Sequence, residues 1–199
     1  MGCDIHLFTE RKRNINDQER WVNIDHLKLN PYYGNNEYED VFVVLNLFEK
    51  RDYRLFSILG NVRNYSNNYF ISEPRGLPHD CSELTKKESI KWGCDGHSHS
   101  YLTLEELKKF REQHRTIKFS GFMSLTDANL VDNGKMPTSW CQGTNASDYV
   151  YREWEYKNEP VGELVELLEE RTREDFCLNK DADTSDYDDK IRIVFWFDN

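Results

Sequence analysis

The segment IRIVFWFDN at positions 191–199 restricts the possible folds of this chain more than any other feature. Its apolar run is nearly unbroken, and it consists mainly of β-branched and aromatic residues, which favour strands. A strand with apolar residues on both sides of its pleat is typical of the buried centre of a sheet. The sequence therefore predicts a central strand here, with other elements paired beside it and packed over it.

The rest of the chain mixes strand and helix signals. Alternating apolar residues predict strands at 3–10 and 20–24, and the apolar stretch 40–48 is compatible with a strand or a helix. Helices are predicted by apolar spacing and by start signals, such as the capping box Thr103–Glu106. Their expected positions are 53–62, from Asp80 or Ser82 to about Trp92, from Thr103 onward, and from Pro160 onward.

This order shows no regular alternation of strand and helix, so it predicts an α+β fold. We expect one compact domain over residues 1–199, built from a mixed or antiparallel sheet with helices packed on it. The length supports one substantial core and is short for two. The polar stretch 179–190 is expected to be a surface loop before the final strand.

The charge and the cysteine content restrict the possible partners and the cellular compartment of the protein. The formal net charge is -10, and a field of that sign repels phosphate backbones at long range, which argues against broad nonspecific nucleic-acid binding. The chain has five cysteines at wide spacings without a CxxC motif, a pattern typical of reduced thiols in a cytosol. No apolar run approaches the length of a membrane span. We therefore expect a cytoplasmic protein without a membrane partner.

Two histidines stand close together in the stretch KWGCDGHSHSY at positions 91–101. If this piece is extended, residues i and i+2 point to one face, about 6.5–7 Å apart at their Cα atoms. His97 and His99 would then converge on one metal ion, as His-x-His pairs do in metal-dependent hydrolases. The alternative is a polar loop with two exposed imidazoles that are satisfied by water.

The first predicted strand carries a second pair of this kind. Asp4 and His6 have the same i, i+2 spacing, on the side of the strand opposite Ile5. Asp198 joins them if the first and last strands are neighbours, which the sequence does not show. The alternative is simple amphipathicity, with Asp4 and His6 facing solvent and Asp198 forming an ordinary polar end.

Together these residues predict a site for a divalent ion such as Zn, Mn or Fe. Its ligands would be Asp4, His6, His97, His99 and Asp198. Such an ion makes hydroxide from water at neutral pH and stabilises charge on a phosphoryl oxygen. Asp95 would serve as an orienting carboxylate, and Arg75 as a bidentate clamp for phosphate. For Arg75 the alternative is a loop ion pair with Glu73.

Several distinctive motifs occur together: MGCDIH at 1–6, SEPRGLP at 72–78, GCDGHSHSYLTLEEL at 93–107, and the FDN ending. This set resembles a group of proteins met in bacteriophage and prophage genomes, for which no activity is established. The likeness covers both ends and the middle of the chain. It implies a phage or bacterial cytoplasmic setting, and it leaves the function open.

The sequence thus supports two main hypotheses. One is a metal-dependent hydrolase acting on a phosphoester, such as a nucleotide or a nucleic-acid end. The other is a phage counter-defence protein that binds a nucleotide or a host factor without turnover, with the same polar cluster forming hydrogen bonds to ligand. A third hypothesis is an acidic mimic of DNA, which would carry carboxylates arrayed on one face.

Overall fold

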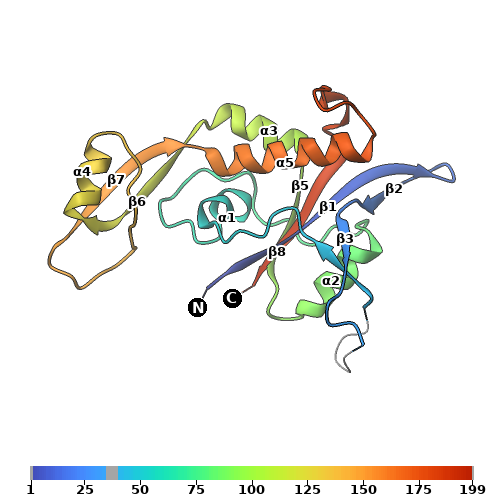
Figure 1. Cartoon of the computed structure of the whole chain (residues 1–199), viewed down its shortest axis with the longest axis horizontal. Helices are drawn as coiled ribbons and strands as arrows, with labels where there is room; N and C mark the ends of the chain where they lie inside the picture. Colours follow the sequence, from blue (N-terminus) through green and yellow to red (C-terminus); the bar gives the residue numbers. More distant parts are fainter. Residues whose placement is uncertain (1, 35–39, 199) are drawn as a thin grey trace.

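The computed structural model describes residues 2–34 and 40–198, and its central element is a four-stranded antiparallel sheet. The strand order is β2-β1-β8-β5. The bounds are Asp4–Ile15 for β1, Gln18–Asn23 for β2, His97–Thr103 for β5 and Ile191–Asp198 for β8. Helices pack against this sheet, so the predicted α+β fold is confirmed (Figure 1). Met1, residues 35–39 and Asn199 belong to the expected domain but lie outside the described residues.

Strand β8 occupies the centre of the sheet, as its composition predicts. Its neighbours are β1 and β5, and every residue from Ile191 to Phe197 is buried. Residues of odd number, such as Phe195 and Phe197, belong to the main hydrophobic core. Residues of even number, such as Trp196, face the other side of the sheet because successive side chains in a strand alternate. We call these the core face and the α2 face, the second after helix α2 (Glu83–Trp92), which packs on it.

Three helices cover the core face: α1 (Tyr53–Gly60), α3 (Leu104–Gln113) and α5 (Glu159–Asp175). Helix α3 begins with the predicted capping box between Thr103 and Glu106, and α5 has Pro160 in its first turn. Helix α1 ends against the sheet at Gly60, where an added Cβ would lie 3.0 Å from the Phe197 ring. A side chain at this position would therefore press against the Phe197 ring, which would have to shift by a few tenths of an ångström.

Helix α2 (Glu83–Trp92) lies on the opposite face and is fixed there by a buried charge network. Glu10 of β1 is fully buried and accepts hydrogen bonds from the Ser82 amide at 2.7 Å and the Thr85 hydroxyl at 2.8 Å. Its second oxygen lies 2.8 Å from the guanidinium of Arg192, which is 3% exposed. The network therefore joins two strands to the start of α2.

Two hairpins extend from this body. Strands β3 (His26–Leu29) and β4 (Phe42–Leu45) form one of them, so the ambiguous stretch 40–48 is a strand in part. Strands β6 (Thr116–Ser124) and β7 (Tyr149–Lys157) form the other, which carries α4 (Leu125–Asp132). This second hairpin projects from the body as an arm (Figure 1). At the arm, Trp154 stacks on Phe119 and meets Trp140 edge-on. Phe119 belongs to the main hydrophobic core, and the two tryptophans pack against that core.

The polar stretch 179–190 connects α5 to β8, as expected for a loop, and includes the short helix η1 (Ser185–Tyr187). It is anchored to α3, because the Lys108 amine binds Asp188 at 2.8 Å and Thr184 is 2% exposed. No helix in residues 2–34 and 40–198 is long and apolar enough to cross a membrane.

The buried charge network yields a stability prediction. Replacing Arg192 with Ala leaves the Glu10 carboxylate buried without its cation, and such a loss lowers the free energy of unfolding by about 3–5 kcal/mol. Arg13→Ala is the matched control, because its ion pair with Asp175 lies at the surface with Arg13 44% exposed, and such pairs contribute less than about 1 kcal/mol. Urea unfolding measures both variants. Similar small losses in the two would contradict the role given to Arg192.

Candidate functional site

The central position of β8 brings predicted site residues from both ends of the chain together. Asp4 of β1 lies opposite Asp198 of β8, and His6 lies opposite Trp196. The Asp198 carboxylate accepts a hydrogen bond from the Asp4 amide at 3.0 Å, and its other oxygen lies 3.2 Å from Nε2 of His6. The first and last strands are thus neighbours, and His6 and Asp198 form a pair on the α2 face.

This pair is partly open to solvent, with both side chains 16% exposed. The His6 ring packs 3.9 Å from the ring centre of Trp92, at the end of α2, and 5.7 Å from that of Trp196. A carboxylate on one ring nitrogen fixes the orientation of an imidazole and decides which nitrogen carries the proton. Chemically, the arrangement suits an acid–base pair or a structural hydrogen bond.

The expectation that His97 and His99 point to one face is wrong, because a β-bulge separates them. His97 pairs with Phe197 and Ser100 with Phe195, so one extra residue lies on β5. Ser98 takes up the irregularity with a positive φ of 52°. His97 therefore stacks on Phe197 of the core face, whereas His99 stacks on Trp196 of the α2 face. A bulge of this kind redirects the side chains that follow it.

His99 is held in a confined space on the α2 face. Its Nε2 lies 3.0 Å from the hydroxyl of Ser89, and a Cβ added at Gly96 would lie 3.3 Å from the ring. Burial lowers the pKa of His99, and the positive charge of nearby His97 lowers it further. These effects favour the neutral imidazole in the folded protein.

The five predicted metal ligands are therefore not gathered at one point. His6, Asp198 and His99 share a face, but the Trp196 ring lies between His6 and His99. Asp4 turns to the guanidinium of Arg51, whose hydrogen bonds lower the pKa of the Asp4 carboxyl. Within the described residues, no three His, Cys, Asp or Glu side chains form a group that could hold a metal ion. The metal site remains a prediction.

The two residues predicted for catalysis lie elsewhere. The Arg75 guanidinium donates to Glu106 of α3 at 2.6 Å and to the carbonyl of Tyr101 at 3.2 Å, in place of the alternative pairing with Glu73. It is therefore occupied and does not project toward the histidines. Asp95 is exposed, and in the described residues its carboxylate bonds only to the Cys94 thiol, at 4.0 Å. Neither side chain forms a hydrogen bond or an ion pair with His6 or His99.

A site that the sequence analysis missed lies between α1 and the β6–β7 arm. A cleft of about 490 Å³ opens there, within the volume range of small-molecule sites. We call it the α1 cleft. Its walls come from α1, the loop that follows α1, strand β6 and the segment 140–142. The lining includes Tyr53, Arg54, Arg63, Asn64, Tyr65, Lys118, Trp140 and Gln142.

The α1 cleft concentrates positive charge in an acidic protein. Arg63 donates to the phenol oxygen of Tyr65 at 3.0 Å, a hydrogen bond that raises the pKa of Arg63. Lys118 is exposed and forms no ion pair with a carboxylate in the part of the chain that the structure describes. Arg54 is bound by both oxygens of Asp52, so its charge is largely neutralised. Lys118 is thus the cation of the cleft best placed to attract an anion, and Arg63 adds positive charge to the lining.

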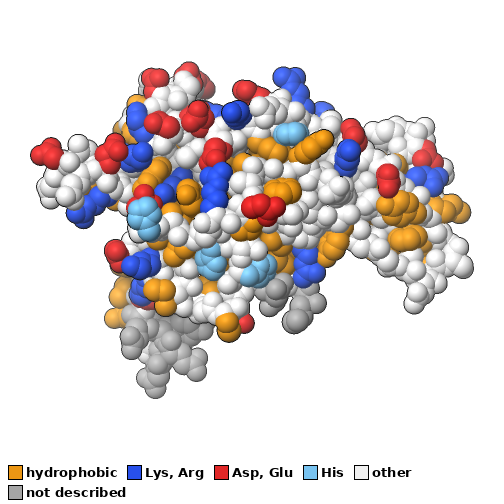
Figure 2. Space-filling model, turned by 180° about the vertical axis from the view of Figure 1, so that it is seen from behind, with side chains coloured by type: hydrophobic (Ala, Val, Ile, Leu, Met, Phe, Trp, Pro, Cys, Tyr) orange, Lys and Arg blue, Asp and Glu red, His pale blue; other side chains and the backbone are white. Residues whose placement is uncertain are grey.

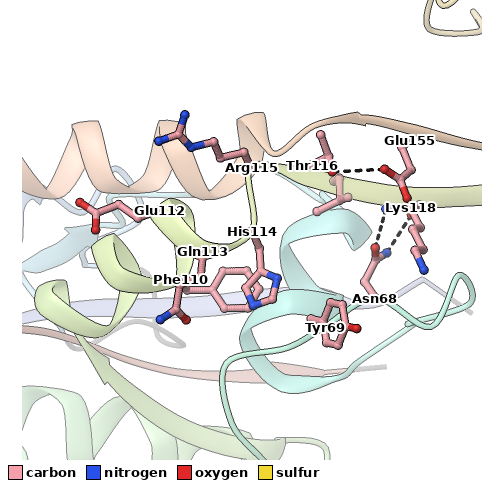
Figure 3. A pocket seen from close by; sticks show the side chains of 11 residues that line it. Asn68, Tyr69, Phe110, Glu112, Gln113, His114, Arg115, Thr116, Lys118 and Glu155 are labelled. Atoms are coloured by element: carbon pink, nitrogen blue, oxygen red, sulfur yellow. Dashed lines mark hydrogen bonds between the residues drawn. The ribbon is translucent and has the colours of Figure 1, made fainter.

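The loop that forms one wall of the cleft is held in a defined shape. Asn61, Arg63 and Asn67 all have positive φ, a conformation that persists only when surrounding contacts impose it. The amide of Asn68 provides such contacts by bonding the backbone of Lys118 twice, at 2.6 and 2.8 Å (Figure 3). The cleft is therefore largely preformed.

Two further cavities adjoin the α1 cleft along the arm. One has a volume of about 700 Å³ and shares Tyr65, Ser66, Lys118 and Phe119 with the cleft. The other, of about 370 Å³, shares Asn68 and Lys118 with it and contains the His114 ring between Tyr69 and Phe110 (Figure 3). One sequence signal for this region was the stretch RNYSNNY at 63–69, which has polar turn residues and tyrosines in a loop, where binding residues often lie.

The comparisons with known proteins add no relative. No family model, no curated protein and no solved structure matches this chain. Functional inference therefore rests on the geometry above, and the resemblance to phage and prophage proteins remains a prediction.

The environment of His99 yields a pH prediction. Because the pKa of His99 is lowered from 6.5 in the folded protein, the unfolded chain takes up this proton first. Stability from this effect is present above about pH 6.5 and is lost as the pH falls toward the lowered pKa. As the pH is lowered from about 7.5 to about 5, the free energy of unfolding should therefore fall less for His99→Asn than for the wild type.

Urea unfolding at several pH values measures this difference, and an NMR titration of the imidazole signals reports the pKa of His99 directly. A His99 signal that titrates at or above the ordinary imidazole value of about 6.5 would contradict the assignment.

Proposed function

We propose that this protein binds a small phosphate-containing ligand of the nucleotide type in the α1 cleft, without turning it over. The observation that carries the proposal is the presence of Arg63 and Lys118 beside aromatic side chains, in a preformed cleft of a chain with net charge -10. Cations supply attraction for phosphate, and aromatic faces supply stacking surfaces for a base.

Polar side chains in the cleft support a nucleotide over a bare anion. The Gln142 amide donates one N–H to the Ser120 carbonyl at 2.9 Å, and its second N–H and its oxygen can read the edge of a base. The Asn64 amide instead bonds Asn61 and Asn68 and so holds the loop in shape. Tyr65 is 52% exposed, so one face of its ring remains available for stacking. The negative charge of the whole protein restricts this attraction to a local pocket, which agrees with a small ligand and not a long nucleic acid.

A phosphoester hydrolase at the α2 face is the second candidate. The specific observation in its favour is the His6–Asp198 pair, which the fold assembles from the first and last strands at 3.2 Å. Against it stands the ligand count, because catalytic zinc sites use three protein ligands. His6 and Asp198 supply two, and His99 is separated from His6 by Trp196.

The acidic DNA mimic has less support. On the face shown in Figure 2, Lys and Arg side chains are interspersed with Asp and Glu side chains, whereas a mimic needs a continuous array of carboxylates. A phage-encoded binder of a nucleotide or of a host factor remains compatible with the α1 cleft.

The binding proposal is tested by calorimetric titration with AMP, GMP, CMP, UMP and inorganic phosphate. We expect at least one nucleotide to bind more tightly than phosphate and to be recovered unchanged. Lys118→Ala should weaken binding about tenfold, since it removes a charge-assisted hydrogen bond. Lys109→Ala, at an exposed position on α3 outside the cleft, is the matched control and should bind like the wild type. If no nucleotide binds at about 1 mM, the proposal fails.

The hydrolase candidate is tested by elemental analysis of the purified protein and by thermal unfolding with added Zn²⁺, Mn²⁺ or Fe²⁺. A metal held by His6 and Asp198 should raise the unfolding temperature of the wild type, and Asp198→Asn should abolish the rise. His26→Ala removes an exposed histidine far from Asp198 in sequence and should retain it. This candidate fails if the protein holds no metal and added metal does not change the unfolding temperature. It also fails if the protein releases no p-nitrophenol from bis(p-nitrophenyl) phosphate.

A further inference from the structure

The two strands of the arm differ in how their outer edges are covered. The outer edge of β6 is paired, because Phe122 exchanges backbone hydrogen bonds with Cys141 at 2.8 and 2.9 Å, and the Asn68 amide bonds the backbone of Lys118. Strand β7 pairs with β6 alone in the part of the chain that the structure describes. The open edge of the hairpin is therefore on the β7 side.

The ladder shows which backbone groups point out of this edge. Since Phe122 directs its N–H and C=O to Cys141, it forms a non-hydrogen-bonded pair with Tyr151. Such pairs alternate with hydrogen-bonded ones along an antiparallel ladder. The backbone groups of Glu153, Glu155 and Lys157 therefore point away from β6, and we call these groups the β7 edge. Within the described residues they have no hydrogen-bond partner, and all three residues are exposed.

Unpaired backbone groups of this kind can bind an extended segment of another protein. In that mode of recognition, main-chain hydrogen bonds supply affinity and alternate side chains supply specificity. Many edge strands prevent such pairing by proline, by a bulge or by short length. Strand β7 has nine residues, Tyr149–Lys157, contains no proline, and keeps a regular register with β6. Its remaining protection is charge, which excludes only strands of like charge.

The side chains beside the β7 edge select the charge of the incoming strand. Glu153 and Glu155 lie two positions apart and so share one face of the hairpin. Their hydrogen-bond partners are neutral hydroxyls, of Tyr151 at 3.1 Å and of Thr116 at 3.4 Å. Neither carboxylate forms an ion pair within the described residues. Opposite charges directly across a ladder are stabilising, whereas like charges are destabilising, so a basic strand fits this edge.

We infer that the β7 edge is a docking surface for an extended basic segment of a partner protein, with Lys or Arg at alternate positions facing Glu153 and Glu155. The segment adds a third strand to the β6–β7 hairpin. A second copy of this chain is the poorer occupant, because each copy carries net charge -10 and the same glutamates. The surface lies outside the lining of the α1 cleft and is independent of the proposed function.

The test uses the synthetic peptide acetyl-TKVKVKT-amide and amide hydrogen exchange of the full chain, followed by NMR. We expect the peptide to protect the amides of Glu153, Glu155 and Lys157. The amides of Trp154 and Tyr156 face β6 and should be protected without it. The same peptide with N-methylated lysines keeps its charge but cannot donate to the edge, and it should bind at least about tenfold more weakly.

Variants of the protein test the role of charge. Glu153→Gln/Glu155→Gln should weaken peptide binding about fivefold to tenfold, since it removes two cross-strand charge pairs. The matched control Glu105→Gln/Glu112→Gln removes the same charge from exposed positions on α3 and should bind like the wild type. The acidic peptide acetyl-TEVEVET-amide should leave the exchange of the β7 amides unchanged.

Several results would overturn the inference. One is unchanged exchange at Glu153 and Glu155 with the basic peptide, and another is equal affinity for its N-methylated form. Equal binding by the double Gln variant would show that charge does not select the partner. Protection of these amides in the protein alone, with the mass of a dimer in sedimentation, would show that a second copy occupies the edge. None of these results bears on nucleotide binding in the α1 cleft.

Discussion

The buried ion pair between Glu10 and Arg192 is the interaction on which the arrangement of the α2 face depends. It joins strands β1 and β8 and extends through Ser82 and Thr85 to the start of α2. Because a buried carboxylate needs its cation and its hydrogen-bond donors, the helix has one favourable position on the sheet. That position brings Trp92, ten residues further on, against His6 and so sets the surroundings of the His6–Asp198 pair.

The sequence predicted the elements of the sheet better than their contacts. The continuous apolar run of β8 identified a central strand, and the capping box identified the start of α3. The contact between His6 and Asp198 follows from strand order, which no local pattern encodes. The orientation of His97 depends on a bulge at Ser98, a residue that gives no local signal for positive φ. The i, i+2 rule fails there because it assumes a regular strand.

The α1 cleft was missed for a related reason. Its walls come from segments far apart in the sequence, and their contact depends on side chains such as Asn68, which bridges a loop to β6. Strand β7 carried a usable signal, since charged and aromatic residues alternate over 153–157, but no pattern indicates which surface its outer side chains face. Strands that line a binding site therefore look like ordinary amphipathic strands.

The central place of β8 has a consequence for how the protein is made. This strand lies between β1 and β5, yet it is synthesised after both of them. On the ribosome, the side chains of β1 remain without their neighbours on β8 until the chain has grown by more than 170 residues. An unpaired apolar strand of that kind is a binding site for chaperones and a hazard for aggregation. We therefore expect the sheet to close only in a late step, after Asp198 has left the exit tunnel.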